Sequence, residues 1–310
     1  MPGGPTPDAQ RNPHRDGYPA ATMTVNERTG ADAIDDVVNL TEMETRIAEL
    51  AASYRDAEPF AHVVIDDVLP QPVLERVYAE LAEMNAGDWN SYIHFNERKF
   101  SNTDTASWGP TLRSVSEVFA GDRFRRFLEQ VSGFDGLHAD VTLDGGGIHR
   151  CYRDGFLNIH ADFTAHHNVA DWRRRVNLLL YLNPTWESEW GGDLELWDRT
   201  MTRCVTKVAP VGNRMLLFST DEHSYHGHPD PLLTPEGVAR QSLALYYFTE
   251  ESNPLAKATD YRPRPNDGAR RMLIFADTKA LALYDKIKRR FHVSDNAVRR
   301  VMATFSRRPK

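Results

Sequence analysis

The residues with the clearest chemical potential lie at positions 158–163, where a histidine and an aspartate stand two positions apart. The segment has the composition of a β-strand, in which alternate side chains share a face, so His160 and Asp162 can approach one ligand together. A distant histidine would complete a set of two imidazoles and one carboxylate on one side of a metal ion. This set suits Fe(II) because it leaves three coordination positions open.

An isolated pair of this kind means little, because a chain with 12 histidines should contain about one by chance. The residues that follow in order give it weight. Candidate third ligands are His223, His226 and His228, and alternation along an extended segment cannot separate the last two. Arg240 and Ser242 then lie two apart on another predicted strand, where a guanidinium and a hydroxyl can bind a carboxylate.

Another predicted strand, over residues 175–183, has two different faces. Leucine occupies alternate positions from 178 to 182, and we expect this aliphatic face to enter a core between two sheets. Asn177 and Tyr181 lie on the opposite face with a leucine between them. That mixture of groups suits a pocket for an oxygen-rich ligand.

The chain has 310 residues, of which 41% are hydrophobic and 10% aromatic. This is enough for a sizeable core, in one large domain with extensions or in two small domains. No apolar run approaches the roughly 18 residues of a transmembrane helix, so no membrane association is expected. Cys151 and Cys204 do not make a disulfide framework, and the cytoplasm is the simplest compartment.

The two ends of the chain differ in charge and composition from the middle. Residues 1–36 are expected to be a disordered extension rich in Pro, Gly, Asp, Arg and Thr, without the apolar stretch of a secretory signal. Met23 is a second candidate for the start of translation. Residues 261–310 contain 14 Lys or Arg and 4 Asp, so this tail carries +10 and the remainder −17 of the net −7. Such a tail could bind nucleic acid or an acidic protein, but the helical spacing of its apolar residues favours a solvated helix face.

Periodicity divides the rest of the chain into three regions. Residues 37–137 are predicted to be mainly helical with the first strands, residues 138–250 to be the β core, and residues 251–310 to be a basic helical extension that packs on this core. Residues 90–112 lack periodicity and are expected to form a long functional loop or irregular strands. The predicted helices are 41–54, behind a capping box at 41–44, then 70–84, 122–131, 278–290 and 295–305.

The β core is predicted from short apolar segments separated by turn residues. The predicted strands are 60–65, 141–143, 148–152, 156–163, 176–182, 193–197, 205–208, 214–218 and 241–249. Short strands joined by Gly, Pro and Asn indicate a sandwich or jelly roll, so the fold class is mainly β with flanking helices. The triple glycine 145–147 does not have the spacing of a nucleotide-binding loop and predicts a turn with a close backbone approach.

An ordered set of motifs spans residues 145–249, about a third of the chain. The motifs are Arg150-Cys151-Tyr152, His160-x-Asp162, Tyr181-Leu182-Asn183-Pro184-x-Trp186, Gly191-Gly192-x-Leu194, Pro210-x-x-Asn213-Arg214, Phe218-Ser219-Thr220, His226-Gly227 and Arg240-x-Ser242. This set resembles the Fe(II)/2-oxoglutarate-dependent oxygenases, in the branch that includes prolyl 4-hydroxylases. The resemblance implies a double-stranded β-helix, a jelly roll, for residues 138–250.

The same resemblance implies Fe(II) as the metal and 2-oxoglutarate as the cosubstrate. His160, Asp162 and His226 would bind the iron, because the family pattern places the distal ligand directly before a glycine. No catalytic residue is expected beyond these ligands.

The cosubstrate would be held mainly by one cation. The resemblance implies that Arg240 pairs with the distal carboxylate of 2-oxoglutarate. Ser242, Tyr181 and Asn177 would support that carboxylate, and Tyr152 would lie beside the iron end of the cosubstrate.

The expected reaction is oxidation of an unactivated C–H bond, with O2 consumed and succinate and CO2 released. The substrate is expected to be a small molecule such as an amino acid, a small peptide or a natural-product intermediate, with ascorbate as a candidate reductant. Asp162 retains the carboxylate that related halogenases lack, so hydroxylation, desaturation, cyclisation or epoxidation is expected rather than halogenation. His149, His166 and Trp197 are candidates for the substrate pocket.

Two alternatives stand beside this prediction. The first is the same chemistry on a protein residue or a nucleic acid, although no aromatic and basic groove of the kind that binds single strands is evident. The second is a non-catalytic jelly roll that binds a metal or a sugar. Arg240 argues against the second, because a closed structural metal site needs no carboxylate anchor.

Overall fold

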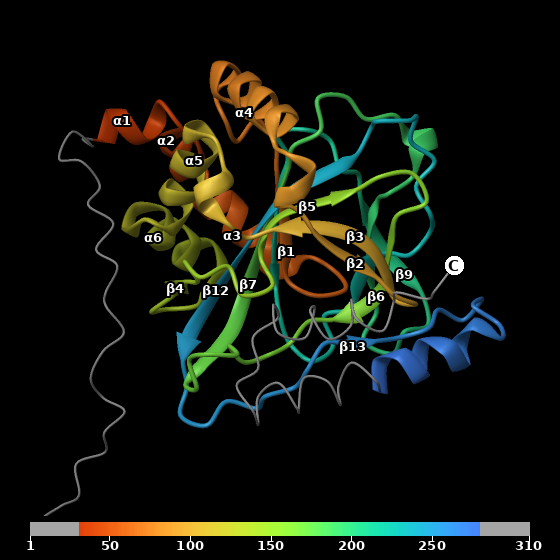
Figure 1. Ribbon diagram of the computed structural model, residues 1–310. Helices are drawn as coiled ribbons and strands as arrows, with labels where there is room; N and C mark the ends of the chain where they lie inside the picture. Colours follow the sequence, from red (N-terminus) through yellow and green to blue (C-terminus); the bar gives the residue numbers. More distant parts are fainter. Residues whose placement is uncertain (1–30, 280–310) are drawn as a thin grey trace, which may run out of the picture.

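The computed structural model describes residues 31–279 (Figure 1). The helix predicted over 295–305 and nearly all of the helix predicted over 278–290 lie outside this range. Within it, helix α1 (Ala31–Asp35) already begins inside the segment predicted to be disordered. Between residues 31 and 279, no helix is both long and apolar enough to cross a bilayer.

Most of the described helices precede the β core. They are α1, α2 (Leu40–Thr45), α3 (Ile47–Asp56), α4 (Gln71–Glu83), α5 (Pro110–Ala120) and α6 (Asp122–Ser132), with short 3-10 helices η1 (Ala86–Asp88), η2 (Thr105–Ser107) and η3 (Ser188–Trp190). A further helix begins at Arg270 and is described as far as Lys279, earlier than predicted. The sequence missed α5, and the predicted capping box is wrong because Thr41 lies inside α2, where its hydroxyl donates to Asp35 (2.6 Å).

The strands of the described chain form one continuous hydrogen-bonded sheet. They are β1 (His62–Ile65), β2 (Asn90–Ile93), β3 (Glu97–Asn102), β4 (His138–Ala139), β5 (Gly147–Cys151), β6 (Phe156–Ala161), β7 (Trp172–Tyr181), β8 (Leu194–Trp197), β9 (Cys204–Val208), β10 (Met215–Ser219), β11 (His226–His228), β12 (Arg240–Glu250) and β13 (Asp260–Tyr261). Their order is β1-β10-β7-β12-β5-β3-β6-β11-β8-β9, and β2, β4 and β13 pair at the sides of β3, β12 and β6.

This antiparallel sheet folds into a nearly closed jelly roll, which confirms the predicted fold class. β1, β10, β7, β12 and β5 form one layer, and β6, β11, β8 and β9 form the other. β3 connects the two layers because it pairs with both β5 and β6. Any side chain that points between the layers is therefore removed from bulk water on both sides.

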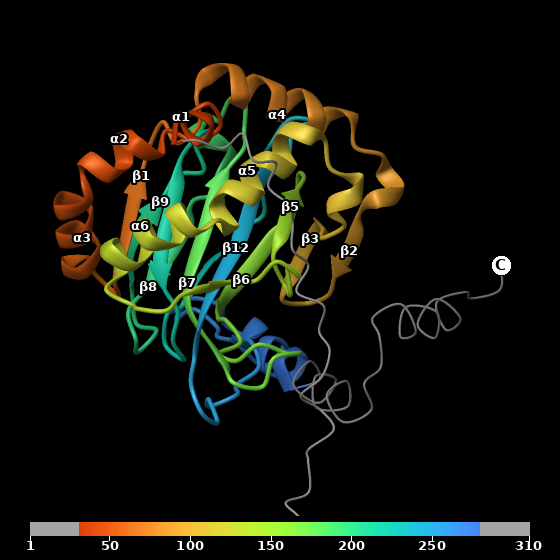
Figure 2. The same cartoon turned by 90° about the vertical axis from the view of Figure 1, so that its left-hand side faces the viewer.

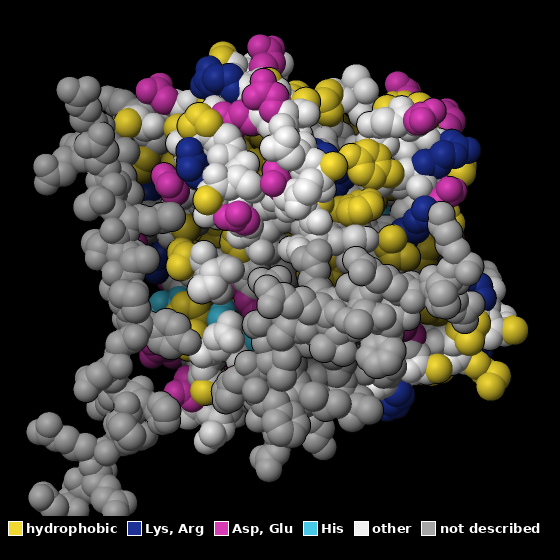
Figure 3. All heavy atoms as spheres, in the orientation of Figure 1, with side chains coloured by type: hydrophobic (Ala, Val, Ile, Leu, Met, Phe, Trp, Pro, Cys, Tyr) yellow, Lys and Arg dark blue, Asp and Glu magenta, His cyan; other side chains and the backbone are white. Residues whose placement is uncertain are grey.

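The helices cover the outer face of the first layer, as Figure 2 shows for α5 and α6 in front of the strands and for α3 beside β1. The leucines of this face, Leu178, Leu180 and Leu182, are fully buried there. They belong to the same apolar cluster as helix residues such as Phe124. The prediction that this face enters a core between two sheets is thus wrong, because it packs against helices. In Figure 3, hydrophobic side chains over the upper part of the visible face are interspersed with acidic and basic ones.

The opposite face of the same strands lines the interior of the jelly roll. Tyr181, Leu216 and Phe218 are fully buried in this space, with Leu179 packed against them. Tyr181 lies opposite Ser242 in the register of β7 and β12. The mixed face of the predicted strand therefore faces inward, where a ligand pocket was expected.

Two turns before the core depend on particular residues. Residues 141–143, predicted as a strand, form a turn in which Asp140 accepts from the backbone N–H groups of Thr142 (2.8 Å) and Asp144 (2.7 Å). Gly147 has a φ of 87°, and a Cβ at this position would collide with the backbone carbonyl of Asn102 in β3. The triple glycine thus allows the close approach of backbones that its sequence predicted.

The side chain of Asn213 connects the β core to the backbone just before α4, and this connection can be tested. Its φ is 64°, and its side chain accepts from the N–H of Leu69 (2.7 Å) and donates to the carbonyl of Leu69 (2.9 Å). Asn213→Ala removes both buried bonds and disfavours the left-handed backbone, so we expect the free energy of unfolding to fall by about 2–4 kcal/mol in urea titrations. The exposed Asn253, with a φ of 54°, is the control. Asn253→Ala should cost about 1 kcal/mol or less, and equal losses for the two variants would contradict this assignment.

Candidate metal centre

Two histidines and one aspartate meet at the end of the second layer, inside the jelly roll. His160 is the second-last residue of β6, Asp162 directly follows this strand, and His226 begins β11 opposite His160 in the register. Each of the three offers one ligand atom, and these atoms lie within 4.8 Å of one another. The Nε2 atoms of His160 and His226 are 3.4 and 3.5 Å from the two carboxylate oxygens of Asp162.

Both imidazoles are oriented by backbone carbonyls. Nδ1 of His160 lies 2.9 Å from the carbonyl oxygen of Asn158, and Nδ1 of His226 lies 2.8 Å from that of Ser224. Because a carbonyl only accepts, each Nδ1 carries the proton and each Nε2 presents a lone pair toward the carboxylate. Burial lowers the pKa of His226 to about 4, so this ring is neutral at ordinary pH. The donor set therefore fits a divalent metal.

Asp162 is held by two residues of β7. Arg174 donates to one carboxylate oxygen (3.0 Å) and Asn177 donates to the same oxygen (2.8 Å), while Arg174 also donates to the amide oxygen of Asn177 (2.7 Å). The Arg174 guanidinium lies 3.4 Å from the centre of the Tyr246 ring. Burial alone would raise the pKa of Asp162, but the charge of Arg174 outweighs burial and holds this pKa well below its ordinary value.

Asn177 therefore occupies a different place from the one expected. Its amide contacts the carboxylate of the candidate metal ligand and not the Arg240 end of the pocket. The sequence missed Arg174 altogether. A register shift between β7 and β12 pairs Tyr247 with Val176 and Phe248 with Arg174, so Arg175 is the extra residue of a bulge. Simple alternation would place Arg174 on the leucine face, and the bulge returns it to the inner face.

Arg240 begins β12 and is 6% exposed. Its Nε donates to the carbonyl of Gly192 (2.8 Å), and its guanidinium lies 5.0 Å from the centre of the Tyr181 ring. Gly192 has a φ of 79°, and a Cβ there would come within 3.2 Å of the Arg240 side chain. Nη1 of Arg240 donates to no residue in the described part of the chain, so the guanidinium retains donors for a ligand.

Ser242 and His149 extend this inner face beside Arg240. Ser242 pairs with Tyr181 on one side and with His149 of β5 on the other, so all three side chains share the interior. Burial, followed by the charge of Lys99, lowers the pKa of His149 to about 3. His149 thus lines the space between the layers as a neutral ring.

Three other predicted site residues lie elsewhere. Tyr152 is 37% exposed and packs its ring against Phe100 outside the interior. Trp197 donates to Glu195 (2.9 Å) and packs on the outer side of the metal-bearing strands with Ile159 and Tyr225.

His166 is the third of these residues. Its Nδ1 accepts from the backbone N–H groups of Asn168 and Val169 at 3.0 Å each, and its Nε2 lies 3.4 Å from Asp140. The Nδ1 atom thus holds the loop between β6 and β7, while Nε2 makes no hydrogen bond within the described residues.

His228, which spacing alone could not distinguish from His226, faces a different partner. Its Nε2 lies 3.8 Å from the Cys151 sulfur, and its pKa is lowered well below the ordinary value by burial and by Arg240. The geometry therefore brings His226, and not His228, to Asp162.

A charged cluster beside the candidate metal ligands carried no signal in the sequence. His94 lies between two carboxylates, with Nε2 2.8 Å from Glu97 and Nδ1 2.8 Å from Asp277 in the last described helix. Glu97 also contacts Lys99 at 2.9 Å. Tyr261 of β13 lies opposite His160 in the register, and their ring centres are 5.3 Å apart. Residues from β3 and from the segment after β12 thus meet at the metal-bearing strand.

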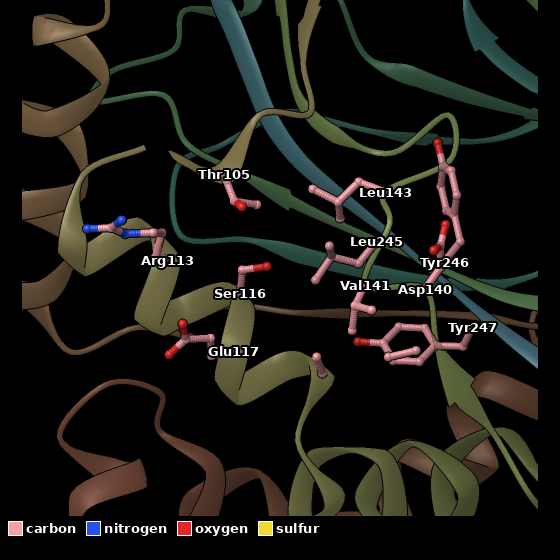
Figure 4. A pocket seen from close by; sticks show the side chains of 12 residues that line it. Thr105, Arg113, Ser116, Glu117, Asp140, Val141, Leu143, Leu245, Tyr246 and Tyr247 are labelled. Carbon is pink, nitrogen blue, oxygen red and sulfur yellow. The ribbon is translucent and has the colours of Figure 1, made fainter. Parts of the chain in front are cut away.

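A separate small cavity of about 70 Å³ lies on the helix side of the first layer (Figure 4). Arg113, Ser116 and Glu117 of α5 line one side of it, and Val141 and Leu245 line the other. None of the candidate metal ligands reaches this cavity.

Comparisons with known proteins agree with this geometry. A sequence profile described as the 2OG-Fe(II) oxygenase superfamily matches residues 147–248, which include the two histidines, the aspartate and Arg240. The match covers about a third of the chain, and this segment is similar to the 2OG-Fe(II) oxygenase superfamily. This family uses Fe(II) and 2-oxoglutarate, and the His160, Asp162 and His226 side chains provide the corresponding donor set.

Among individual proteins, the chain is 25% identical over 200 residues to the mouse (Mus musculus) prolyl 3-hydroxylase OGFOD1. The match covers 62% of the chain but 33% of that relative, so the chain spans about a third of the relative's length. Two solved structures are also similar. A Pseudomonas putida prolyl-4-hydroxylase has 20% identity and a TM-score of 0.48, over 65% of this chain and 99% of that one. A Trichoplax adhaerens prolyl hydroxylase, in complex with a hypoxia inducible factor peptide fragment, has 19% identity and a TM-score of 0.49, over 68% and 92%.

The contact between Asn177 and Asp162 predicts an effect on metal affinity. Asn177→Ala removes a donor to the carboxylate and an acceptor for Arg174, so Mn(II) or Fe(II) affinity should fall by roughly 10–100-fold in anaerobic titrations. Asn183→Ala is the matched control, because that buried amide bonds only backbone groups, at Pro210 and Gln241. The control should lower the melting temperature without changing metal affinity. Wild-type affinity in the Asn177 variant would refute the proposed support of Asp162.

The position of His94 predicts a pH dependence. Burial would lower its pKa, but Glu97 and Asp277 outweigh burial and raise it above 6.5. The bridge is therefore fully formed below pH 6.5 and is lost as pH rises through the raised value. Hydrogen-exchange protection of residues 270–279, corrected for intrinsic rates, should fall over this range in the wild type. In His94→Gln it should be low and independent of pH, and identical profiles for the two proteins would exclude the bridge.

Proposed function

We propose that this protein is an Fe(II)- and 2-oxoglutarate-dependent dioxygenase that oxidises an unactivated C–H bond, by hydroxylation in the simplest case. The observation that carries the proposal is the pair of imidazoles whose Nε2 atoms face the Asp162 carboxylate inside the jelly roll. Fe(II), when bound with 2-oxoglutarate, supplies O2 activation coupled to decarboxylation of the keto acid to succinate and CO2.

The side chains of the pocket divide the remaining work. His160, Asp162 and His226 would hold one side of the metal, and Arg174 would keep the carboxylate ionised and in place. Arg240 would receive the distal carboxylate of 2-oxoglutarate, because its guanidinium is buried and keeps a donor without a partner among the described residues. The two layers and the helices over the first one would exclude water from the reaction.

We propose a small molecule as the substrate, such as an amino acid, a small peptide or a natural-product intermediate. Charged side chains at Glu97 and Lys99 beside the metal-bearing strand support a polar substrate. A prolyl residue of a protein is the second candidate, and the name of the mouse relative favours it. The two free cysteines support a reducing compartment such as the cytoplasm.

The ligand assignment is tested by turnover. Wild-type protein should release succinate from 2-oxoglutarate when Fe(II) and O2 are present, and His160→Ala or Asp162→Ala should abolish this release while keeping the folded circular-dichroism spectrum. Absence of any 2-oxoglutarate binding or turnover in the wild type would favour a non-catalytic jelly roll.

The anchor assignment predicts a selective effect at Arg240. Arg240→Met leaves a buried carboxylate without its counter-charge, so the 2-oxoglutarate concentration needed for half-maximal succinate release should rise by roughly 100-fold or more. Arg214→Met is the control, since Arg214 pairs with Asp66 at the surface (2.6 Å). The control should keep the wild-type requirement, and an unchanged requirement in the Arg240 variant would remove the anchor from the mechanism.

A further inference from the structure

A second cation lies on the inner face that carries Arg240. Arg240 pairs with Cys151 in the register of β12 and β5, and Phe100 pairs with Arg150 in the register of β3 and β5. Continuing the second register by one residue sets Lys99 opposite Cys151. Arg240 and Lys99 thus flank β5 on one face, separated by two strand spacings, or about 10 Å.

The Glu97 carboxylate holds the Lys99 ammonium in place, and His94 holds the carboxylate. The ammonium lies 2.9 Å from one oxygen of Glu97, and the side chains of Lys99 and Glu97 are 16% and 8% exposed. The other oxygen of Glu97 contacts His94. Burial would lower the pKa of Lys99, but Glu97 outweighs burial and raises it, so the ammonium keeps its charge. An ammonium has three donors, and Glu97 accounts for one of them.

Tyr261 brings another donor to the same place. Its side chain is 5% exposed, its ring lies between those of His160 (5.3 Å) and His94 (6.3 Å), and its hydroxyl bonds no residue of the described chain. A tyrosine hydroxyl is an O–H donor at ordinary pH. Tyr261 therefore stands between the candidate metal ligands and the cluster of Lys99.

Several donors in this part of the interior have no acceptor among the described residues. Nη1 of Arg174 is buried without a hydrogen-bond partner, and Lys99 and Tyr261 keep donors without described acceptors. Leaving the Arg174 donor buried and unpaired is costly, and a ligand rich in acceptor atoms would satisfy it together with the donors of Lys99 and Tyr261.

The charges in this space point to an anion. Lys99 and Glu97 cancel, as do protonated His94 and Asp277. With Fe(II) and doubly charged 2-oxoglutarate bound, the remaining charges of Asp162, Arg174 and Arg240 leave one positive charge, which a monoanionic substrate would neutralise.

We propose that Lys99 and Tyr261 form a subsite that binds a carboxylate of the primary substrate beside the candidate iron ligands. This inference rests on the proposed oxygenase function and names its substrate class as small carboxylic acids. Lys99 would supply the charge and Tyr261 a neutral donor, while Glu97 would fix the ammonium and compete with the ligand for it. The carboxylate would place the rest of the substrate over the metal position left open by 2-oxoglutarate.

The test uses acetate as the probe, because it is small enough to enter without knowledge of the rest of the substrate. Full-length protein is loaded with Mn(II) and saturated with N-oxalylglycine, an unreactive analogue that occupies the 2-oxoglutarate site. Relaxation of the acetate methyl protons by Mn(II) then reports binding close to the metal, and neutral acetamide shows how much of it depends on charge. We expect saturable relaxation with acetate and at least a fivefold weaker response with acetamide.

Two variants at the ion pair should move affinity in opposite directions. Glu97→Gln frees Lys99 from its counter-ion, and acetate should bind at least threefold more tightly than in the wild type. Glu97→Gln with Lys99→Met removes the cation without stranding a buried carboxylate, and acetate binding should fall at least tenfold below the single variant. Tyr261→Phe should weaken it by roughly tenfold, the loss expected for one hydrogen bond to a charged group.

A second Lys–Glu pair serves as the control. Lys207 contacts Glu195 at 2.9 Å on β9 and β8, with the Lys207 side chain 56% exposed. Glu195→Gln should leave acetate relaxation at the wild-type level. Melting curves for every variant separate loss of fold from loss of binding.

The outcomes distinguish the subsite from the function on which it rests. If wild-type protein retains neither Mn(II) nor N-oxalylglycine, the oxygenase function fails. If both are retained but acetate relaxation is the same in all variants, or equal to that of acetamide, the subsite is wrong. If Lys99→Met in the Glu97→Gln background instead weakens N-oxalylglycine, Lys99 belongs to the cosubstrate site and the proposal is overturned.

Discussion

The structure depends on one buried anion that is compensated by two donors of β7. Asp162 lies between two layers of a β-sheet, where an isolated carboxylate would be strongly destabilised. Arg174 supplies the opposite charge, Asn177 a neutral donor, and the imidazoles of His160 and His226 face its oxygens. The same contacts that make the carboxylate tolerable also hold it ionised and fixed, which is what a metal ligand requires.

The jelly roll makes this arrangement possible because each strand has two environments. One face of β7 packs leucines against the helices, and the other presents Asn177 and Tyr181 to the interior. β12 likewise sends Arg240 and Ser242 inward, opposite Cys151 and His149 of β5. Burying polar side chains inside the jelly roll costs free energy. The main apolar core, which the helices form with the leucine face of β7, offsets this cost.

The sequence predicted most of the second half of the fold, because alternation and turn residues are local signals. His160, Asp162 and Arg240 lie on or beside predicted strands, whereas β11, which carries His226, was not predicted. The structure brings His160, Asp162 and His226 together. The aliphatic face of β7 was assigned to the wrong neighbour, since a leucine face fits a helix as well as a sheet. The sequence does not predict α5, because this helix begins within the aperiodic stretch 90–112, which predicts a loop or irregular strands.

The residues that sequence reasoning missed or misplaced depend on non-local geometry. Arg174 reaches Asp162 only because a bulge at Arg175 reverses its face. Tyr261 and Asp277 meet His160 and His94 across more than 100 residues of chain, so no spacing rule could pair them. Tyr152 is expected at the iron, yet His149 and Cys151 face inward, so alternation along β5 leaves the Tyr152 ring outside.

The most direct test of the account is an anomalous-difference map from crystals grown with Mn(II) and 2-oxoglutarate. The account predicts one strong peak within coordination distance of Nε2 of His160, Nε2 of His226 and a carboxylate oxygen of Asp162, with the keto acid reaching from that peak to the Arg240 guanidinium. A metal bound instead between His228 and Cys151, or a keto acid that does not contact Arg240, would contradict it.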